Sequence, residues 1–235
     1  MRLPFTTEQF LDVFVRYNDA VWPAPAVLMV LAIGAITYSV REWPQDGRRV
    51  SAILAVLWLW MAIVYHIAFF ASLTRAAVLF ALAFVVQSGL FAWLAMRPHT
   101  LGYRPRANAA GVIGAVLIAY ALIGYPVVGY LVGHRYPAAP TFGVPCPTTI
   151  FTFGLLLWST GPFARRLAMV PALWAIVGSS AAANLGMTED LGLLVAALCA
   201  VPLIFAPRRS APYLSGPTRA TSTGGNPSTR SNVAS

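Results

Sequence analysis

The residues best able to do chemistry gather between Gly133 and Gly154, in the stretch GHRYPAAPTFGVPCPTTIFTFG. This stretch combines four prolines with His134, Tyr136 and Cys146, and it separates two strongly apolar runs of the chain. An imidazole and a thiol can carry protons, bind a soft metal ion or react as nucleophiles. We therefore expect a functional site in or next to this connector.

The sequence Pro145-Cys146-Pro147-Thr148-Thr149 is typical of a helix start, because proline is tolerated in the first turn. The unpaired backbone N–H groups there can receive an anion or favour a thiolate. Cys146 is thus a candidate reactive thiol or metal ligand, with His66 or His134 as partner. A small buried residue in a turn stiffened by proline is the alternative, which the lack of a second cysteine nearby favours.

Ionisable residues also occur in or beside other apolar runs. His66 lies inside one, where an imidazole is costly unless it faces a partner, the bundle interior or water. It is either a neutral ring hydrogen-bonded to a neighbouring helix or a ligand or proton carrier. Glu189 and Asp190 lie between the last two apolar runs. They either pair with a base, for which His66, Arg75 and Arg135 are candidates, or cap the last helix.

Eight residues form the predicted solute-binding set: His66, His134, Tyr136, Cys146, Thr148, Asn184, Glu189 and Asp190. The candidates for a metal site are Cys146, His66 and His134. The sequence has no nucleotide-binding P-loop and no HExxH, GxSxG or CxxCH motif, so it predicts no cofactor and no ATP-driven or standard hydrolytic mechanism.

Composition indicates which elements must position these side chains. Hydrophobic residues make up 58% of the chain, charged residues 10%, and the mean hydropathy is +0.70, as in membrane proteins. All sixteen basic residues besides histidine are arginines, and most lie in short connectors between apolar runs. This pattern indicates membrane topology rather than binding of nucleic acid.

Seven apolar runs are visible, and a helix needs about 20 residues to cross a bilayer. The first four reach that length and the last three do so only marginally; the runs are 22–40, 50–73, 76–96, 109–132, 144–161, 167–183 and 190–206. The sequence thus predicts an all-α, polytopic transmembrane bundle of seven spans, or of six if the fifth run is re-entrant. A tight hairpin is expected at Thr74 and Arg75.

Arginines alternate between the two sides of this arrangement. The connectors 41–49, 97–108 and 162–166 and the tail hold twelve arginines, and the other segments hold four. Because cytoplasmic loops carry the positive excess, we expect the N-terminus outside and the C-terminus in the cytoplasm. The eight candidate residues then gather at or near the outer face.

Three regions follow from these patterns. Residues 1–21 form an N-terminal segment whose residues 7–20 are predicted to be an amphipathic helix at the membrane surface, with Phe10, Val13, Phe14 and Tyr17 on one face. Residues 22–206 form the bundle. Residues 207–235, rich in Ser, Thr, Gly, Pro and Arg, are predicted to be a disordered cytoplasmic tail.

Two stretches, LPFTTEQFLDVFVRYNDAVWP at 3–23 and the connector sequence at 133–154, resemble the signatures of an uncharacterised bacterial integral membrane family, a domain of unknown function. The resemblance extends over about residues 3–206. Members are often named permease-like automatically. The resemblance implies the membrane fold and a bacterial inner-membrane location, and it implies no catalytic residue.

The expected function is a permease or channel-like protein for a small solute or ion, with an outward-facing polar site. Its expected partners are the lipid bilayer and that solute or ion, without nucleic acid, and a homo-oligomer is compatible with the sequence. An integral-membrane redox or metal-binding enzyme is one alternative. A membrane sensor or scaffold subunit is another.

Overall fold

The computed structural model describes residues 4–41, 43–97 and 101–206, and the predicted tail lies outside them. The described chain is mostly helical. Its α-helices are α1 (Thr7–Val21), α2 (Ala24–Arg41), α3 (Asp46–Trp60), α4 (Ala76–Met96), α5 (Ala109–Ala119), α6 (Tyr125–Leu131), α7 (Pro145–Trp158), α8 (Ala164–Leu167), α9 (Met169–Leu185) and α10 (Leu191–Phe205). The π-helical segments η1 (Met61–Phe69) and η3 (Tyr120–Gly124) continue α3 and α5, and the 3₁₀ turns η2 (Phe70–Ser72) and η4 (Thr188–Asp190) precede α4 and α10.

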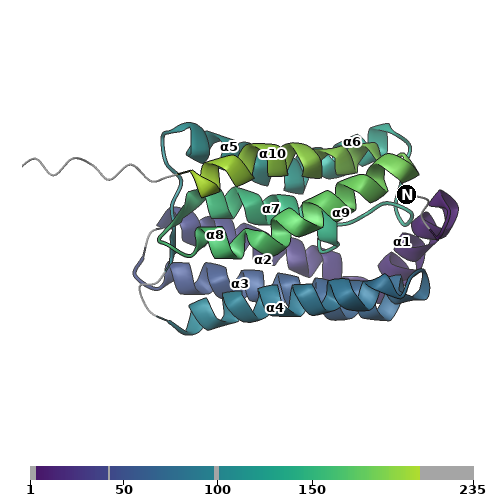
Figure 1. Ribbon diagram of the computed structural model, residues 1–235, viewed down its shortest axis with the longest axis horizontal. Coiled ribbons are helices and arrows are strands. Elements are labelled where there is room, and N and C mark those ends of the chain that lie inside the picture. The colour runs from purple at the N-terminus through teal and green to yellow at the C-terminus, as the bar shows by residue number, and fades with distance from the viewer. Residues whose placement is uncertain (1–3, 42, 98–100, 207–235) are drawn as a thin grey trace, which may run out of the picture.

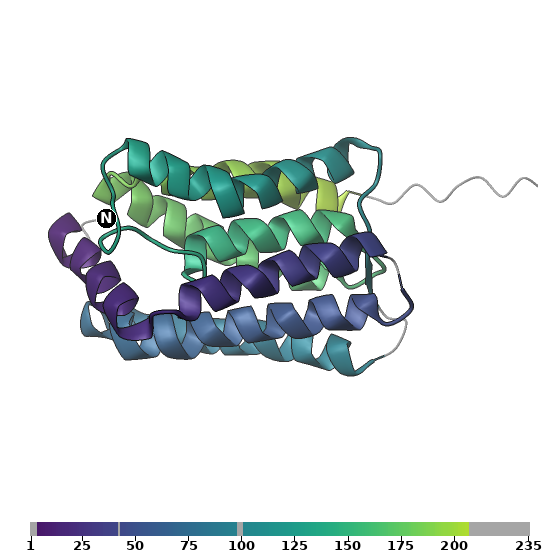
Figure 2. The same cartoon turned by 180° about the vertical axis from the view of Figure 1, so that it is seen from behind.

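The long helices lie side by side along the molecule, and α1 lies across one end of the bundle (Figures 1 and 2). Helix α3 packs against α2 and α4, and α7 packs against α5, α9 and α10. Most connections between neighbours are short, as is usual in helical bundles, and the two longer ones follow α4 and α6. The hairpin predicted at Thr74 and Arg75 is confirmed between η2 and α4.

Six helical stretches are long and apolar enough to cross a membrane: Ala24–Arg41, Asp46–Ser72, Ala76–Met96, Ala109–Leu131, Ala164–Leu185 and Thr188–Phe205. Large apolar side chains cover their outer surfaces; Leu79 and Ile176, for example, are 68% and 70% exposed. Such a surface suits lipid and not water. The molecule is therefore a helical bundle of an integral membrane protein.

The fifth predicted run, 144–161, forms a shorter helix, α7, of 14 residues. Nearly every side chain of α7 is buried by other helices, which explains why the helix carries no charged residue. Figure 2 shows the connector after α6 running inward from the end of the bundle before α7 begins. The choice between seven spans and six, and the orientation, stay predictions.

Helix α7 comes close to α5 because two glycines face each other. A Cβ atom on Gly154 would lie 2.8 Å from the carbonyl oxygen of Gly114, closer than real Cβ contacts. The Trp158 indole then donates a hydrogen bond to the Gly111 carbonyl oxygen at 2.9 Å. Small residues at such contacts are typical of helix packing in membranes.

Helix α1 begins with a capping box formed by Thr6 and Gln9, and its predicted amphipathic character is confirmed. Phe10, Phe14 and Tyr17 lie on one face, as predicted, but they are buried by the protein instead of lying at the membrane surface. They pack on aromatic side chains of the bundle, including Tyr65 and Phe70, so this face does not contact lipid. The helix covers the end of the bundle.

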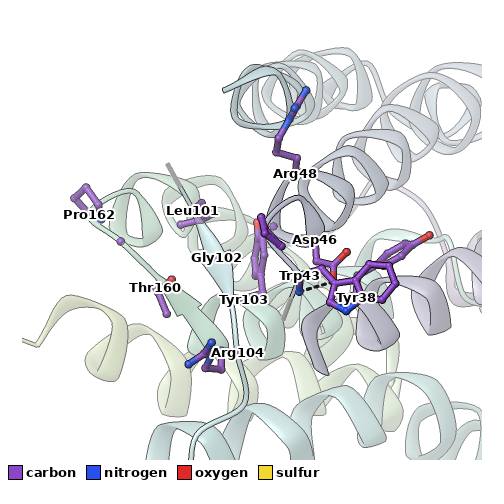
Figure 3. A pocket seen from close by; sticks show the side chains of 13 residues that line it. Tyr38, Trp43, Asp46, Arg48, Leu101, Gly102, Tyr103, Arg104, Thr160 and Pro162 are labelled. Atoms are coloured by element: carbon purple, nitrogen blue, oxygen red, sulfur yellow. Dashed lines mark hydrogen bonds between the residues drawn. The ribbon is translucent and has the colours of Figure 1, made fainter. Parts of the chain in front are cut away.

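The opposite end holds a two-residue antiparallel ladder between β1 (Gly102–Tyr103) and β2 (Ser159–Thr160), beside a cavity of about 550 Å³ (Figure 3). Asp46 accepts hydrogen bonds from the Trp43 N–H at 2.9 Å and from Arg49 at 2.8 Å. Arg48 donates to the Ala95 carbonyl oxygen at 2.7 Å. These charged groups hold the connectors of this end together, and none of the predicted site residues lies there.

Candidate functional site

The candidate site lies at the end of the bundle that α1 covers, where the connector after α6 meets η4. Helix α6 stops because Gly133 adopts a left-handed conformation with φ of 99°. The backbone N–H of His134 then donates back to the Gly129 carbonyl oxygen at 2.9 Å, a common way to end a helix. This turn directs the His134 imidazole toward η4, and its Nδ1 lies 2.6 Å from Oε1 of Glu189.

Glu189 is fully buried, with 0% of its surface exposed. Its Oε1 atom bonds to His134, whereas its Oε2 atom has no hydrogen-bond partner. A Cβ atom on Gly129 would lie 3.7 Å from Oε1, so α6 passes directly over this carboxyl group. A carboxyl group that is buried with one oxygen unpaired is costly and marks a functional site by default.

Asp190, the next residue, is also buried, and its Oδ1 accepts a hydrogen bond from the Tyr125 hydroxyl. Its carboxyl group also lies beside the thiol of Cys146 at the start of α7. Tyr120 donates to the backbone carbonyl oxygen of Glu189 at 2.8 Å. Two tyrosines from η3 and α6 thus fix the turn that presents both carboxyl groups.

Asn18 fixes the connector from the α1 side. Its amide donates to the carbonyl oxygens of Pro137 at 2.7 Å and Ala139 at 2.8 Å, and its side-chain oxygen accepts from Thr141 at 2.8 Å. Asn18 is completely buried, and these bonds satisfy its side chain together with carbonyl groups of the half-buried Pro137 and Ala139. The connector is therefore an ordered wall of the site.

Two cavities adjoin these residues. The connector cavity, of about 450 Å³, is lined by His134, Tyr136, Trp22 and Tyr125 among others. The aromatic cavity, of about 420 Å³, is lined by Asp190, Cys146, Trp174 and again Tyr125. Tyr125 lines both cavities, His134 lines the first and Asp190 the second, and Glu189 lines neither.

A family model described as "Family of unknown function (DUF6064)" matches residues 7–213. The chain belongs to DUF6064. This agrees with the resemblance to an uncharacterised family. No curated protein and no solved structure matches the chain.

The structure of this DUF6064 protein brings together His134, Cys146, Glu189 and Asp190 from the predicted set. Tyr136 lies at the rim of the connector cavity, 54% exposed, and its hydroxyl donates to the Asn18 carbonyl oxygen at 3.4 Å. Asn184 is exposed, lines the aromatic cavity and donates to the Ser180 carbonyl oxygen at 2.7 Å. Thr148 is buried away from both cavities and accepts from the Gly143 N–H at 3.2 Å.

His66 lines neither cavity. It is fully buried in η1, where its Nδ1 lies 2.8 Å from the Met61 carbonyl oxygen of its own helix, and its Nε2 has no partner. Its ring packs edge-on against Phe84 and Trp174. The prediction that His66 bonds to a neighbouring helix is thus wrong. The wider π-helical turn instead offers the ring a carbonyl oxygen of its own segment.

The expected partners of the acidic pair are wrong as well. Glu189 bonds to His134 and Asp190 to Tyr125, not to His66, Arg75 or Arg135. Asp190 occupies the N-cap position of α10, as the capping alternative expected, but its side chain makes no cap hydrogen bond and turns to Tyr125 instead. The start of α7 at Pro145 is confirmed.

Sequence reasoning missed Tyr120, Tyr125 and Trp174. The signal available for the tyrosines was a Tyr-Pro step at Tyr125 inside an apolar run. Pro126 lacks an N–H and so cannot donate the usual helical hydrogen bond, and the π-helical turn η3 directly precedes it.

In the part of the chain that the structure describes, no three His, Cys, Asp or Glu side chains are placed to hold a metal ion. The three predicted metal candidates bond to or adjoin other groups instead. His134 bonds to Glu189, Cys146 adjoins Asp190, and His66 is bonded within its own helix.

Proposed function

We propose that this DUF6064 protein is a small permease whose solute binds in the connector cavity, with His134, held by the buried Glu189, at its polar end. The observation that carries this proposal is the Glu189 carboxyl group, fully buried, bonded to His134 through one oxygen and unpaired at the other. Ionisable groups at membrane depth typically mark the pathway of a solute, ion or proton.

The cavity limits the kind of solute. Its volume of about 450 Å³ suits a small molecule, and its lining combines aromatic and proline side chains with few polar groups. Glu189 does not itself line the cavity and acts through His134, so the solute needs a group that hydrogen-bonds to the imidazole. We expect a small, mainly apolar amine, or a proton carried by His134 and Glu189 themselves.

The proposal includes the topology. The extended connector and α7 together make the seventh crossing, because the connector begins at the end where α6 stops and α7 ends beside β1. The arginine-rich connectors lie at the β1–β2 end, which we place in the cytoplasm, and the end covered by α1 faces outward. By the family resemblance, the membrane is the bacterial inner membrane.

Uptake of radiolabelled butylamine into proteoliposomes tests the proposal. We expect saturable uptake that Glu189→Gln reduces at least tenfold and that the matched variant Glu8→Gln, at an exposed carboxyl group of α1, leaves unchanged. Neutralising the carboxyl group removes the charge that attracts the amine while keeping the side-chain shape. A saturable butylamine flux that Glu189→Gln and His134→Gln leave at the wild-type level would contradict the assigned site.

The same vesicles carry a test of the proton alternative. With a pH-sensitive dye inside and no amine present, an imposed pH gradient should collapse faster with the wild-type protein than with Glu189→Gln. Butylamine uptake and gradient collapse that both equal those of empty vesicles would overturn the permease proposal for these two substrates.

A further inference from the structure

We infer that the β1–β2 end of the bundle binds the phosphate head group of an anionic phospholipid, through Arg97 at the end of α4 and Arg166 of α8. This inference does not depend on transport through the connector cavity. It rests on a stack of side chains that brings the two arginines together, on the excess of positive charge around them and on their place beside lipid-facing helices.

Two arginines and two aromatic rings pack in a continuous row between α4 and α8. The Arg97 guanidinium group lies over the Trp93 ring, with its central carbon 4.7 Å from the ring centroid. Trp93 packs edge-on against Phe163, with centroids 5.5 Å apart, and Arg166 lies over the Phe163 ring at 5.6 Å. These four residues form the arginine–aromatic stack. It joins two positive charges that are far apart in the sequence.

Stacking of this kind suits phosphate binding. A ring contacts the flat face of a guanidinium group, whereas the N–H groups point outward in its plane, where phosphate oxygens can bind two of them at once. The rings under Arg97 and Arg166 also restrict two long side chains, so less conformational entropy is lost when a ligand binds. Both arginines are exposed, so a head group can reach them.

Positive charge dominates this end of the bundle. Eight arginines and two acidic residues occur in the connectors 41–49, 97–108 and 162–166. Of the two acids, Glu42 lies outside the described residues, and Asp46 is already paired with Arg49 at 2.8 Å. Arg48 adds a positive charge at the end of α4, where it donates to the Ala95 carbonyl oxygen at 2.7 Å. The stack therefore lies in surroundings that attract an anion.

The position of the stack favours a lipid over a soluble phosphate. Trp93 lies in the last turn of α4 and Phe163 directly precedes α8, and both helices belong to stretches long and apolar enough to cross a membrane. Tryptophan at the end of a span typically lies at the level of the lipid head groups. Met96 and Met169, at the adjoining ends of α4 and α9, are 70% and 58% exposed, which suits contact with acyl chains. Basic sites between membrane helices bind anionic head groups in this way.

Native mass spectrometry of the purified full-length protein in detergent tests this site, because each bound lipid adds a defined mass. We expect phosphatidylglycerol to bind at least fivefold more tightly than phosphatidylcholine with the same acyl chains, since choline cancels the phosphate charge. A tenfold excess of inorganic phosphate or glycerol 3-phosphate should not displace it. Equal affinity for the two lipids would overturn the recognition of an anionic head group, and displacement by either soluble phosphate would overturn the lipid assignment.

The matched variants change arginines at the two ends of the bundle. Arg97→Gln combined with Arg166→Gln should weaken phosphatidylglycerol binding at least tenfold, because it removes both charges of the stack. Arg135→Gln is the control, since Arg135 is stacked on Tyr130 at 4.9 Å near the opposite end, and we expect it to leave the affinity unchanged. Wild-type affinity in the double variant, or an equal loss in Arg135→Gln, would overturn the site.

Phe163→Leu tests the stack without changing its charge. The variant removes the ring that contacts both Trp93 and Arg166, and we expect at least threefold weaker phosphatidylglycerol binding. Trp43→Leu is its control, because Trp43 lies under Arg41 at 5.4 Å and outside the stack. Thermal unfolding in the same detergent shows which variants fold, and Phe163→Leu decides if the double arginine variant does not. Wild-type affinity in folded Phe163→Leu would overturn the stack as the binding element, and butylamine uptake by the double variant tests the permease proposal separately.

Discussion

The Nδ1 atom of His134 lies 2.6 Å from Oε1 of Glu189, although 55 positions separate the two residues in the chain. The pair joins the end of α6 to the turn before α10, and Glu189 has no exposed surface. A buried charge needs such a partner, so the pair links the stability of the bundle end to the chemistry of the site.

His134→Ala should destabilise the protein by about 3 kcal/mol, because it leaves the carboxyl group of Glu189 buried without a partner. Glu189→Gln should cost less, since a neutral amide is cheaper to bury than a carboxylate. Thermal unfolding of both single variants and the double variant in the same detergent measures the coupling. We expect the double variant to cost less than the sum, and strictly additive costs would show that the two side chains do not interact.

Gly129→Leu should disrupt the site, whereas Gly129→Ala should be tolerated. A Cβ atom at position 129 would make an ordinary contact at 3.7 Å with Oε1 of Glu189, but a larger side chain would displace the carboxyl group. Gly89→Leu is the matched control, because nothing lies within 4 Å of a Cβ atom built there on α4. The measurement is the thermal unfolding temperature together with butylamine uptake, and equal effects of the two leucine variants would refute this account.

Asn18→Ala should lower the free energy of unfolding by about 2–3 kcal/mol, because it leaves two half-buried carbonyl oxygens and one hydroxyl without their partner. Asn184→Ala removes the same side chain from an exposed position with one bond to Ser180, and its expected effect is within about 0.5 kcal/mol of zero. Limited proteolysis of the connector should accelerate only in the first variant. Unchanged unfolding and proteolysis of Asn18→Ala would contradict an ordered connector.

Burial raises the pKa of Tyr17 to about 12, against a smaller opposing effect of the hydrogen bond that its oxygen accepts from Trp60 at 2.8 Å. The folded state therefore holds this proton more tightly than the unfolded state does. The contribution of Tyr17 to the free energy of unfolding is therefore complete below pH 10. It is lost as pH rises from about 10 to 12, by about 2–3 kcal/mol in total. Unfolding measured from pH 8 to pH 12 should show this loss, and Tyr17→Phe should reduce it; an unchanged pH profile in that variant would assign the loss to other groups.

Much of the architecture follows from local properties of the sequence. Six of the seven predicted apolar runs form helices of membrane-spanning length, because hydropathy and length act within one segment. The apolar face of α1 and the helix start at Pro145 were predicted for the same reason, since periodicity and proline geometry are properties of neighbouring residues. The grouping of His134, Tyr136 and Cys146 in the connector was visible for the same reason, since these residues are close together in the sequence.

The tertiary structure decided which of these residues meet. Glu189 pairs with His134 and not with His66, because the turn after α6 carries His134 over η4 while π-helical geometry ties His66 to its own backbone. The burial of α7 on all sides was not visible either, since an apolar run looks alike whether lipid or other helices surround it. The sequence by itself thus determined a membrane bundle with a polar connector, and packing between distant segments decided the partners of each buried charge.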